Sequence, residues 1–393
     1  MIAIPKGYRF STAQAGFKYT NRDDLALLFS DVEAAGAAVF TTNRFQAAPV
    51  IVAKELLSEG AGLRGILVNA GQANACTGAQ GIADCRRTLQ MTAEALGVEP
   101  GSLLPASTGV IGDHLKMELW ERAVPALIQN LGQKTPMDAA KAIMTTDSFP
   151  KMVWRTVQTV DGEITILGMA KGAGMICPNM ATMLGFVLCD ADVDPSWWQE
   201  TIAQAVDKSF NAVTVDGDTS TNDCVIGLAN SASRVNATGE SRESLRHGLV
   251  AVCRELSYRI VQDAEGGTKV VTIRVTGGVD DRDAERAART IGHSPLVKTA
   301  MFGQDPNWGR IVAALGRSGA AFDPDRVQIR LANILIFSHG RPVAMDRDAV
   351  FAVYLSRKDI EIHVDLREGT GHYTLLTSDL THEYVRINAE YRT

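Results

Sequence analysis

Runs of β-branched residues alternate with amphipathic helical runs along the chain, and this alternation constrains the fold more than any other sequence feature. The segment "GILVNAG" (65–71) is typical of a buried strand, and apolar residues then recur at helical spacing from Ile82 to Leu96, where Gly97 ends them. "VVTIRV", "RVQIRLANILIF" and "DIEIHVDL" are typical of further strands. Because the elements follow no strict βαβ order, we predict mixed α/β layers with largely antiparallel sheets.

The glycine-rich stretch "KGAGMICPNMATML", residues 171–184, lies between a predicted hairpin and a predicted buried strand. Asp161-Gly162 suits the tight turn between the two β-rich arms that precede the stretch. The apolar run after Thr182 predicts a strand, and Pro195 stands where the next helix would begin. This stretch is therefore the natural place to divide the chain into two halves.

Composition excludes several classes of function. The 393 residues carry a net charge of -6 with no basic stripe, so we expect no nucleic-acid partner. No signal peptide and no apolar window of membrane-spanning length is visible, which predicts a soluble cytoplasmic protein. The six cysteines are spread singly, so we expect no disulfide framework. No two histidines have the spacing of metal ligands, and nucleotide-binding and hydrolase motifs are absent, so we expect neither a metal nor a cofactor.

Thr182 opens the apolar run and has no histidine near it in the sequence. To act as a nucleophile it needs another base, and a cut just before it would supply its own α-amine, with a pKa near ~8. Gly172, Gly174 and Pro178 could fix the unusual turn that such a cut requires. The residues alone leave a second interpretation open, in which Thr182 is an ordinary β-branched strand residue.

Three other polar turns carry residue types that suit catalysis or binding. In "PASTGVIG" (105–112), the Thr108 hydroxyl and the Gly109 amide could point at one developing negative charge, as in an oxyanion hole. The acids of "VDGDTSTND" (215–223) suit a cation, and Glu265 in "DAEGGTK" could meet an amine. Each stretch also fits an ordinary hydrogen-bonded turn or a solvated carboxylate, and local sequence does not choose between them.

Seven motifs in order resemble the ornithine acetyltransferase family of arginine biosynthesis, also called glutamate N-acetyltransferases. The resemblance runs from "IPKGYRF" to the last residue, so it covers essentially the whole chain. The motifs are "STGVIG", "MTTDSFPK", "KGAGMICPNMATML", "DGDTSTND", "DAEGGTK", "DPNWGRI" and "THEYVRINAEYRT". The fold it implies is that family's layered α/β sandwich, which is similar to the N-terminal-nucleophile hydrolases in mechanism only.

The resemblance also implies how the chain is processed and what it catalyses. Self-cleavage between Ala181 and Thr182 would leave an α chain of residues 1–181 and a β chain of residues 182–393, two of each forming a heterotetramer. Thr182 would take the acetyl group from N2-acetyl-L-ornithine and pass it to L-glutamate in a ping-pong reaction without a cofactor. Some members of the family also use acetyl-CoA, and the resemblance leaves both donors open.

By the same resemblance, Thr182 is the nucleophile and Thr108 and Gly109 form the oxyanion hole. The substrate contacts it implies are Thr145 (with Thr146 as the alternative), Lys171, Thr182, Glu265, Asn388 and Thr393. A lysine for carboxylate and a glutamate for ammonium would suit amino-acid substrates. Two alternatives stay open, a self-processed threonine aminopeptidase or amidase with water as acceptor, and an uncleaved binding protein.

Overall fold

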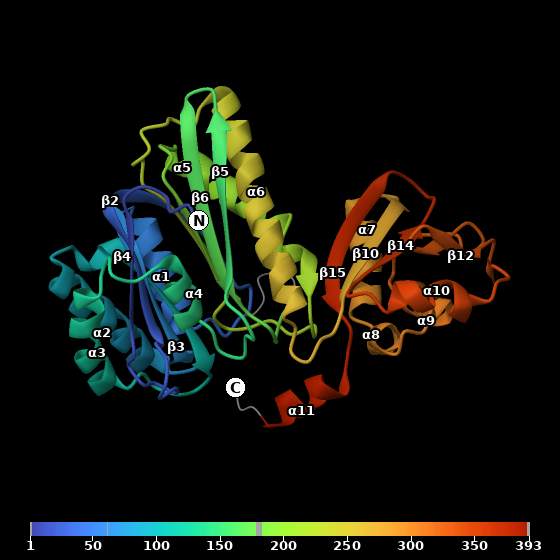
Figure 1. The fold of residues 1–393 in the computed structure, drawn as a ribbon, viewed down its shortest axis with the longest axis horizontal. Helices are drawn as coiled ribbons and strands as arrows, with labels where there is room; N and C mark the ends of the chain where they lie inside the picture. The colour runs from blue at the N-terminus through green and yellow to red at the C-terminus, as the bar shows by residue number, and fades with distance from the viewer. Residues whose placement is uncertain (1, 61, 178–182, 391–393) are drawn as a thin grey trace. The chain divides into compact units, whose positions relative to one another are not determined.

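A computed structural model describes residues 2–60, 62–177 and 183–390, which form two compact units (Figure 1). The described residues of the first unit fall within Met1–Asn211 and Asp218–Ile260, and those of the second within Ala212–Gly217 and Val261–Tyr391. The units therefore divide near residue 260, well after the glycine-rich stretch. Cleavage at 181–182 would cut within the first unit.

The first unit is built on an eight-stranded sheet. Its strands lie in the order β4 (Leu103–Val110), β3 (Leu63–Gln72), β2 (Leu25–Phe40), β9 (Cys224–Ala229), β7 (Leu184–Cys189), β6 (Gly162–Lys171) and β5 (Lys151–Thr159), with β1 (Tyr8–Ala13) paired to β2. The pairs β3–β4 and β7–β9 are parallel, and the other pairs are antiparallel. Because β6 and β7 are neighbours, the sheet continues across the predicted cleavage position.

Helices cover both faces of this sheet. A large apolar core lies between the sheet and the first four helices, α1 (Ala48–Glu59), α2 (Gly78–Leu96), α3 (Met117–Gln129) and α4 (Pro136–Ala142). The helices α5 (Pro195–Asp207) and α6 (Gly239–Gln262) lie on the other face. A Cβ on Gly168 of β6 would lie 2.6 Å from Val252 of α6, so this helix approaches the sheet closely. The predicted layered sandwich is confirmed.

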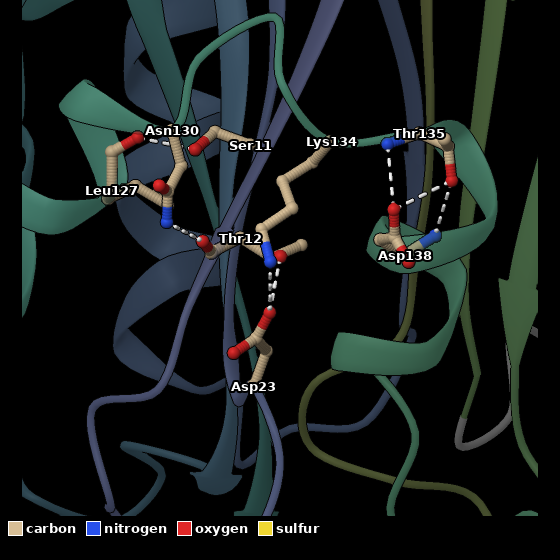
Figure 2. Close-up of polar contacts among 8 residues, drawn as sticks. All are labelled: Ser11, Thr12, Asp23, Leu127, Asn130, Lys134, Thr135 and Asp138. Atoms are coloured by element: carbon tan, nitrogen blue, oxygen red, sulfur yellow. Dashed lines mark hydrogen bonds and ion pairs between the residues drawn. The ribbon is translucent and has the colours of Figure 1, made fainter.

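Polar contacts tie the end of α3 to the first strand, and a capping box begins α4 (Figure 2). The Ser11 hydroxyl donates a hydrogen bond into the last turn of α3, and the Asn130 amide donates to the Thr12 carbonyl at 3.0 Å. Thr135 and Asp138 form a capping box, in which each side chain accepts from the other residue's backbone N–H, and this begins α4. These contacts fix the helix from which the chain runs into the "MTTDSFPK" motif.

The second unit has a seven-stranded sheet with helices packed on it. The strands lie in the order β13 (Arg341–Pro342), β12 (Ile334–Ser338), β11 (Gln328–Leu331), β14 (Asp359–Asp365), β10 (Val270–Gly278), β15 (Gly371–Ser378) and β8 (Val213–Thr214). The helices of this unit are α7 (Asp281–Gly292), α8 (Pro295–Phe302), α9 (Trp308–Gly316), α10 (Arg347–Leu355) and α11 (His382–Glu390). Elsewhere in the chain, short 3-10 helices lie at Pro100–Ser102, in the first unit, and at Phe210–Ala212. The core of this unit lies between its sheet and α7 to α10, whereas α11 buries none of its residues.

Several local predictions are confirmed and two are corrected. Gly97 is the left-handed C-cap of α2, and Pro195 is the first residue of α5. The run "RVQIRLANILIF" forms two antiparallel strands rather than one, because Ala332 takes a positive φ of 51° and turns the chain. The strand after the glycine-rich stretch ends at Cys189, earlier than the apolar pattern suggests. Within the described ranges, no helix has the length and apolar character needed to span a membrane.

Candidate active site

Thr108 and Gly109 lie near the end of β4, where this strand runs parallel to β3. Gly109 is paired with Gly71, and both have positive φ values, 134° and 121°. A Cβ on Gly109 would lie 2.1 Å from the carbonyl carbon of Gly71, a distance that no side chain tolerates. The close approach of the two strands at this point therefore requires glycine at position 109. This contact fixes the backbone at the predicted oxyanion hole.

Lys171, the last residue of β6, reaches Thr108. Its Nζ donates to Thr108 Oγ1 at 3.3 Å, and the two residues are only 3% and 6% exposed. Because the hydroxyl oxygen accepts from the ammonium group, its own proton points elsewhere and can be donated. A positive charge beside a hydroxyl donor, both held out of water, stabilises negative charge that develops nearby. The oxyanion-hole roles of Thr108 and Gly109 stay predictions.

A buried carboxylate, Asp147, lies at the centre of the polar contacts around Lys171. Its Oδ1 accepts from Lys151 Nζ at 2.6 Å and from the Gly172 backbone N–H at 2.7 Å, and its Oδ2 accepts from the Thr145 N–H at 3.0 Å. Burial acts to raise the pKa of Asp147, but the charges of Lys171 and Lys151 and the hydrogen bonds outweigh it and lower the pKa to about 2. Asp147 therefore stays ionised and links the segment of Thr145 to the start of the glycine-rich stretch.

The "VDGDTSTND" motif packs against the ends of β3 and β4. Asn222 donates from Nδ2 to the carbonyl oxygens of Ala73 at 2.6 Å and Ser107 at 2.9 Å. Asn222 is buried, so these bonds hold the motif beside the strand that carries Thr108. No group of three or more potential metal ligands occurs among the residues that the structure describes.

The last residue of this motif, Asp223, is fully buried beside the start of β7. Its Oδ1 accepts from the Met183 backbone N–H at 2.9 Å. Burial raises the pKa of Asp223 well above its ordinary value, and the Met183 hydrogen bond and the charge of Lys171 act in the opposite direction. This carboxyl group therefore anchors the residue that directly follows Thr182.

In the second unit, Glu265 and Asn388 lie together. Asn388 donates from Nδ2 to Glu265 Oε2 at 2.9 Å. A Cβ on Gly266 would lie 2.5 Å from the backbone nitrogen of Tyr384, and the Thr381 hydroxyl donates to the Gly266 carbonyl at 2.7 Å. The glycine thus allows the loop that carries Glu265 to approach the first turn of α11 closely.

The structure describes six of the predicted site residues and brings them into two groups. Thr108, Gly109, Thr145 and Lys171 belong to the first unit, where direct contacts or the Asp147 carboxylate connect them. Glu265 and Asn388 form the pair in the second unit. The predicted nucleophile Thr182, the residue before the predicted cut, Ala181, and the C-terminal Thr393 lie outside the described residues. Their roles remain predictions.

Sequence reasoning did not single out three buried ionisable residues of the first unit, namely Asp147, Lys151 and Asp223. Asp147 and Lys151 stand four residues apart in "MTTDSFPK", a spacing that could have suggested an ion pair. Asp223 ends "VDGDTSTND", but no local pattern showed that it lies against the residue after Thr182. That contact joins residues 40 apart in the chain.

A model of the ArgJ family matches residues 9–393. The chain is 54% identical over 392 residues to the arginine biosynthesis bifunctional protein ArgJ of Nitratidesulfovibrio vulgaris, and the match covers 100% of both chains. It is 47% identical to the protein of the same name from Geobacter sulfurreducens, over 99% of both chains. The crystal structure of the bifunctional protein ArgJ from Bacillus halodurans is similar with a TM-score of 0.50 and 36% identity, covering 52% of the present chain and 98% of that chain.

Proposed function

The chain belongs to the ArgJ family, and on that premise we propose that it moves the acetyl group of N2-acetyl-L-ornithine to L-glutamate, releasing ornithine and N-acetyl-L-glutamate. It is an acyltransferase of arginine biosynthesis. The bifunctional relatives favour a second activity in the same chain, the acetylation of glutamate by acetyl-CoA. No cofactor takes part in either reaction.

One observation supports the acyl-transfer chemistry above all others, the contact between Lys171 and Thr108. An acetyl carbonyl under attack becomes an oxyanion, and a hydroxyl polarised by a buried ammonium group is a strong donor to it. Gly109 supplies the second donor from its backbone N–H in this proposal. Its close contact with Gly71 holds that backbone in place before any substrate binds.

The proposed nucleophile is Thr182, made N-terminal by cleavage after Ala181. Its hydroxyl attacks the acetyl carbonyl, ornithine leaves with the proton that the α-amine has taken up, and an acetyl ester remains on Thr182. The amine of glutamate then attacks this ester and frees the hydroxyl. A cut at 181–182 leaves two chains, each about half as long as the original. The Bacillus halodurans chain has a similar length, since 52% of this chain matches 98% of that one.

Substrate binding is assigned to the remaining predicted residues. Lys171 and Thr145 bind the donor and acceptor in the first unit, and Glu265 and Asn388 contribute a carboxylate and an amide for an ammonium group. Thr393 completes the set. We further propose a heterotetramer of two α and two β chains in the cytoplasm, where cysteine thiols stay reduced.

A denaturing gel together with an acetyl-transfer assay tests this proposal. The wild-type gene product should give two bands, and N2-acetylornithine should be consumed only when glutamate is present. Thr182→Ala should give a single full-length band and no transfer. Cleavage of that variant at residue 181 would refute the nucleophile assignment. If acetate is released at the same rate with and without glutamate, the protein is a hydrolytic amidase instead.

A further inference from the structure

The loop between β1 and β2, residues 14–24, borders the predicted oxyanion hole. A Cβ on Gly71 would lie 2.9 Å from the Cβ of Lys18 and 3.2 Å from its backbone nitrogen. Gly71 is also the partner of Gly109 in the strand pair β3–β4. One glycine thus separates Lys18, which is exposed, from the residue that supplies a backbone donor to the predicted hole.

A second lysine, Lys116, lies beside the first. Its Nζ donates to the carbonyl of Phe17 at 3.2 Å, directly before Lys18 in the chain. Its backbone N–H donates to Gln72 Oε1 at 3.2 Å, and Gln72 directly follows Gly71. Lys116 is exposed as well. Two lysines from distant segments are therefore anchored around the end of β3.

Arg22, on the same loop, lies against the other predicted segment of the first unit. Its guanidinium donates to the carbonyl of Met144, the residue before Thr145. The guanidinium lies over the Tyr19 ring, with 3.7 Å between Cζ and the ring centroid, so its orientation is held. Met144 is its hydrogen-bond acceptor among the described residues, and a guanidinium has five N–H donors. Donors therefore remain for an anion.

The two acids of the loop are engaged in other contacts. Asp24 is fully buried, and its carboxylate accepts from the backbone N–H groups of residues 15–17 at 2.7, 3.3 and 2.7 Å. The charge of Arg22 also acts on it. Asp23 pairs with Lys134 at 3.4 Å (Figure 2). One acid thus holds the loop from within, and a lysine balances the charge of the other.

Resting on the second activity proposed above, we propose that Lys18, Arg22 and Lys116 bind the phosphate groups of acetyl-CoA. Ammonium and guanidinium groups are the side chains that bind phosphate oxygens in proteins. The acetyl group of this donor has to reach the predicted oxyanion hole, which these residues border. About 14 bonds join the acetyl carbonyl carbon to the first phosphorus, a chain that spans at most ~18 Å and can bend. The phosphates therefore lie on the loop while the acetyl group lies at the hole.

The number of cations favours a phosphate ligand over a single carboxylate. N2-acetylornithine and glutamate each carry an α-carboxylate, for which Lys171 is already assigned. Acetyl-CoA carries three phosphate groups, and each of them is negatively charged at neutral pH. Three cations around one rim match such a ligand better than they match one carboxylate.

Replacement of the lysines should separate the two acetyl donors. We expect Lys18→Met and Lys116→Met each to raise KM for acetyl-CoA by about 10–100-fold, the range that hydrogen bonds to charged groups allow. KM and kcat with N2-acetylornithine should stay within about twofold, which also shows that each variant is folded. Lys6→Met is the matched control, because this exposed lysine lies before the opposite end of β1. It should leave both KM values unchanged.

Direct binding tests Arg22, since its replacement also removes the contact with Met144. We expect adenosine 3′,5′-bisphosphate, which carries two of the phosphates without the acetyl group, to bind wild type in calorimetry. Arg22→Met should weaken this binding by about 10-fold or more. Arg64→Met is the matched control, because Arg64 also donates to backbone carbonyls and lies over an aromatic ring, but near the opposite end of β3 from Gly71.

The outcomes separate this inference from the proposed function. Equal rises in both KM values in Lys18→Met would assign the lysine to an amino-acid carboxylate, and unchanged values would assign it to neither donor. Either result overturns the inference and leaves the proposed function standing. If wild type uses N2-acetylornithine but neither uses acetyl-CoA nor binds the bisphosphate, the inference and the second activity are both wrong.

A wild type that transfers acetyl from neither donor would refute the proposed function by itself. Calorimetry then still decides on the phosphate site. Binding of the bisphosphate that is lost in Arg22→Met and kept in Arg64→Met would support the site, and equal binding by the two variants would overturn it.

Discussion

Lys151 and Asp147 form an ion pair with no solvent-exposed side-chain surface, and 2.6 Å separate Nζ from Oδ1. Both residues belong to the "MTTDSFPK" motif, and the same carboxylate accepts hydrogen bonds from the backbone N–H groups of Thr145 and Gly172. A buried charge costs several kcal/mol unless it is paired. The position of the predicted substrate segment therefore depends on this pair.

Removal of one partner should destabilise the protein strongly. Lys151→Met keeps most of the side-chain volume but removes the cation of the ion pair with Asp147, and we expect a loss of about 3–5 kcal/mol in the free energy of unfolding. Urea denaturation followed by tryptophan fluorescence measures this. As a control, Arg9→Met breaks the half-exposed pair with Asp31 and should cost less than about 1 kcal/mol. Equal losses in the two variants would contradict the role of the buried pair.

The same carboxylate should set part of the acid stability. The folded-state pKa of Asp147 is about 2, below its ordinary value of 3.8. The stabilisation is therefore complete above pH 3.8 and is lost as the pH falls toward 2, a change on the order of 2 kcal/mol. Denaturation curves between pH 5 and 2 should fall more steeply for wild type than for Asp147→Asn. Parallel curves would show that Asp147 does not carry this dependence.

The sequence was sufficient to predict most of the elements of the fold. The hairpin around Asp161-Gly162, the helix stop at Gly97 and the helix start at Pro195 depend on local turn and cap chemistry. The order of strands could not be predicted, since the pairing of β2 with β9 joins residues nearly 200 apart. Local patterns carry no signal for such contacts.

Some residues of the candidate site can likewise be predicted from the sequence, and others cannot. Thr108, Gly109 and Lys171 were named because their motifs resemble a family, and the structure then places Lys171 within hydrogen-bond distance of Thr108. Asp147 and Asp223 were missed because their importance comes from burial and from contacts with distant segments. The local sequence of a polar turn does not show whether its carboxylate is solvated or buried.

Loss of the Thr108 hydroxyl should slow acetyl transfer. Thr108→Val keeps the shape of the side chain but removes the donor, and we expect kcat to fall by about 10²–10³-fold, because such a donor acts chiefly on the transition state. Ser107→Ala is a matched control on the same strand. It removes the hydrogen bond to Asn69 and should lower stability while it leaves kcat within about twofold. Unchanged kcat in Thr108→Val would remove this residue from the oxyanion hole.

Glu265 should act in binding. N2-acetylornithine carries its only ammonium group on the side chain, so a carboxylate that recognises it should lower KM. We expect Glu265→Gln to raise KM for N2-acetylornithine by about 10–100-fold, the range that hydrogen bonds to charged groups allow. Glu383→Gln is the control, because that exposed carboxylate pairs with Arg386. Equal KM values in wild type and Glu265→Gln would contradict the assignment.

Lys298 should make the second unit more stable at alkaline pH. Burial lowers its pKa from 10.5 to about 8, although the charges of Asp379 and Asp216 oppose the shift, and its Nζ donates to Thr377 at 3.0 Å. Between pH 8 and 10.5 the unfolded chain binds this proton and the folded chain does not, so stability rises with pH in that window. Relative to Lys298→Met, wild type should gain roughly 1–3 kcal/mol from pH 8 to 10 in urea denaturation. Replacing the exposed Lys54 by methionine should leave the slope unchanged, and a wild-type curve parallel to that of Lys298→Met would refute the shift.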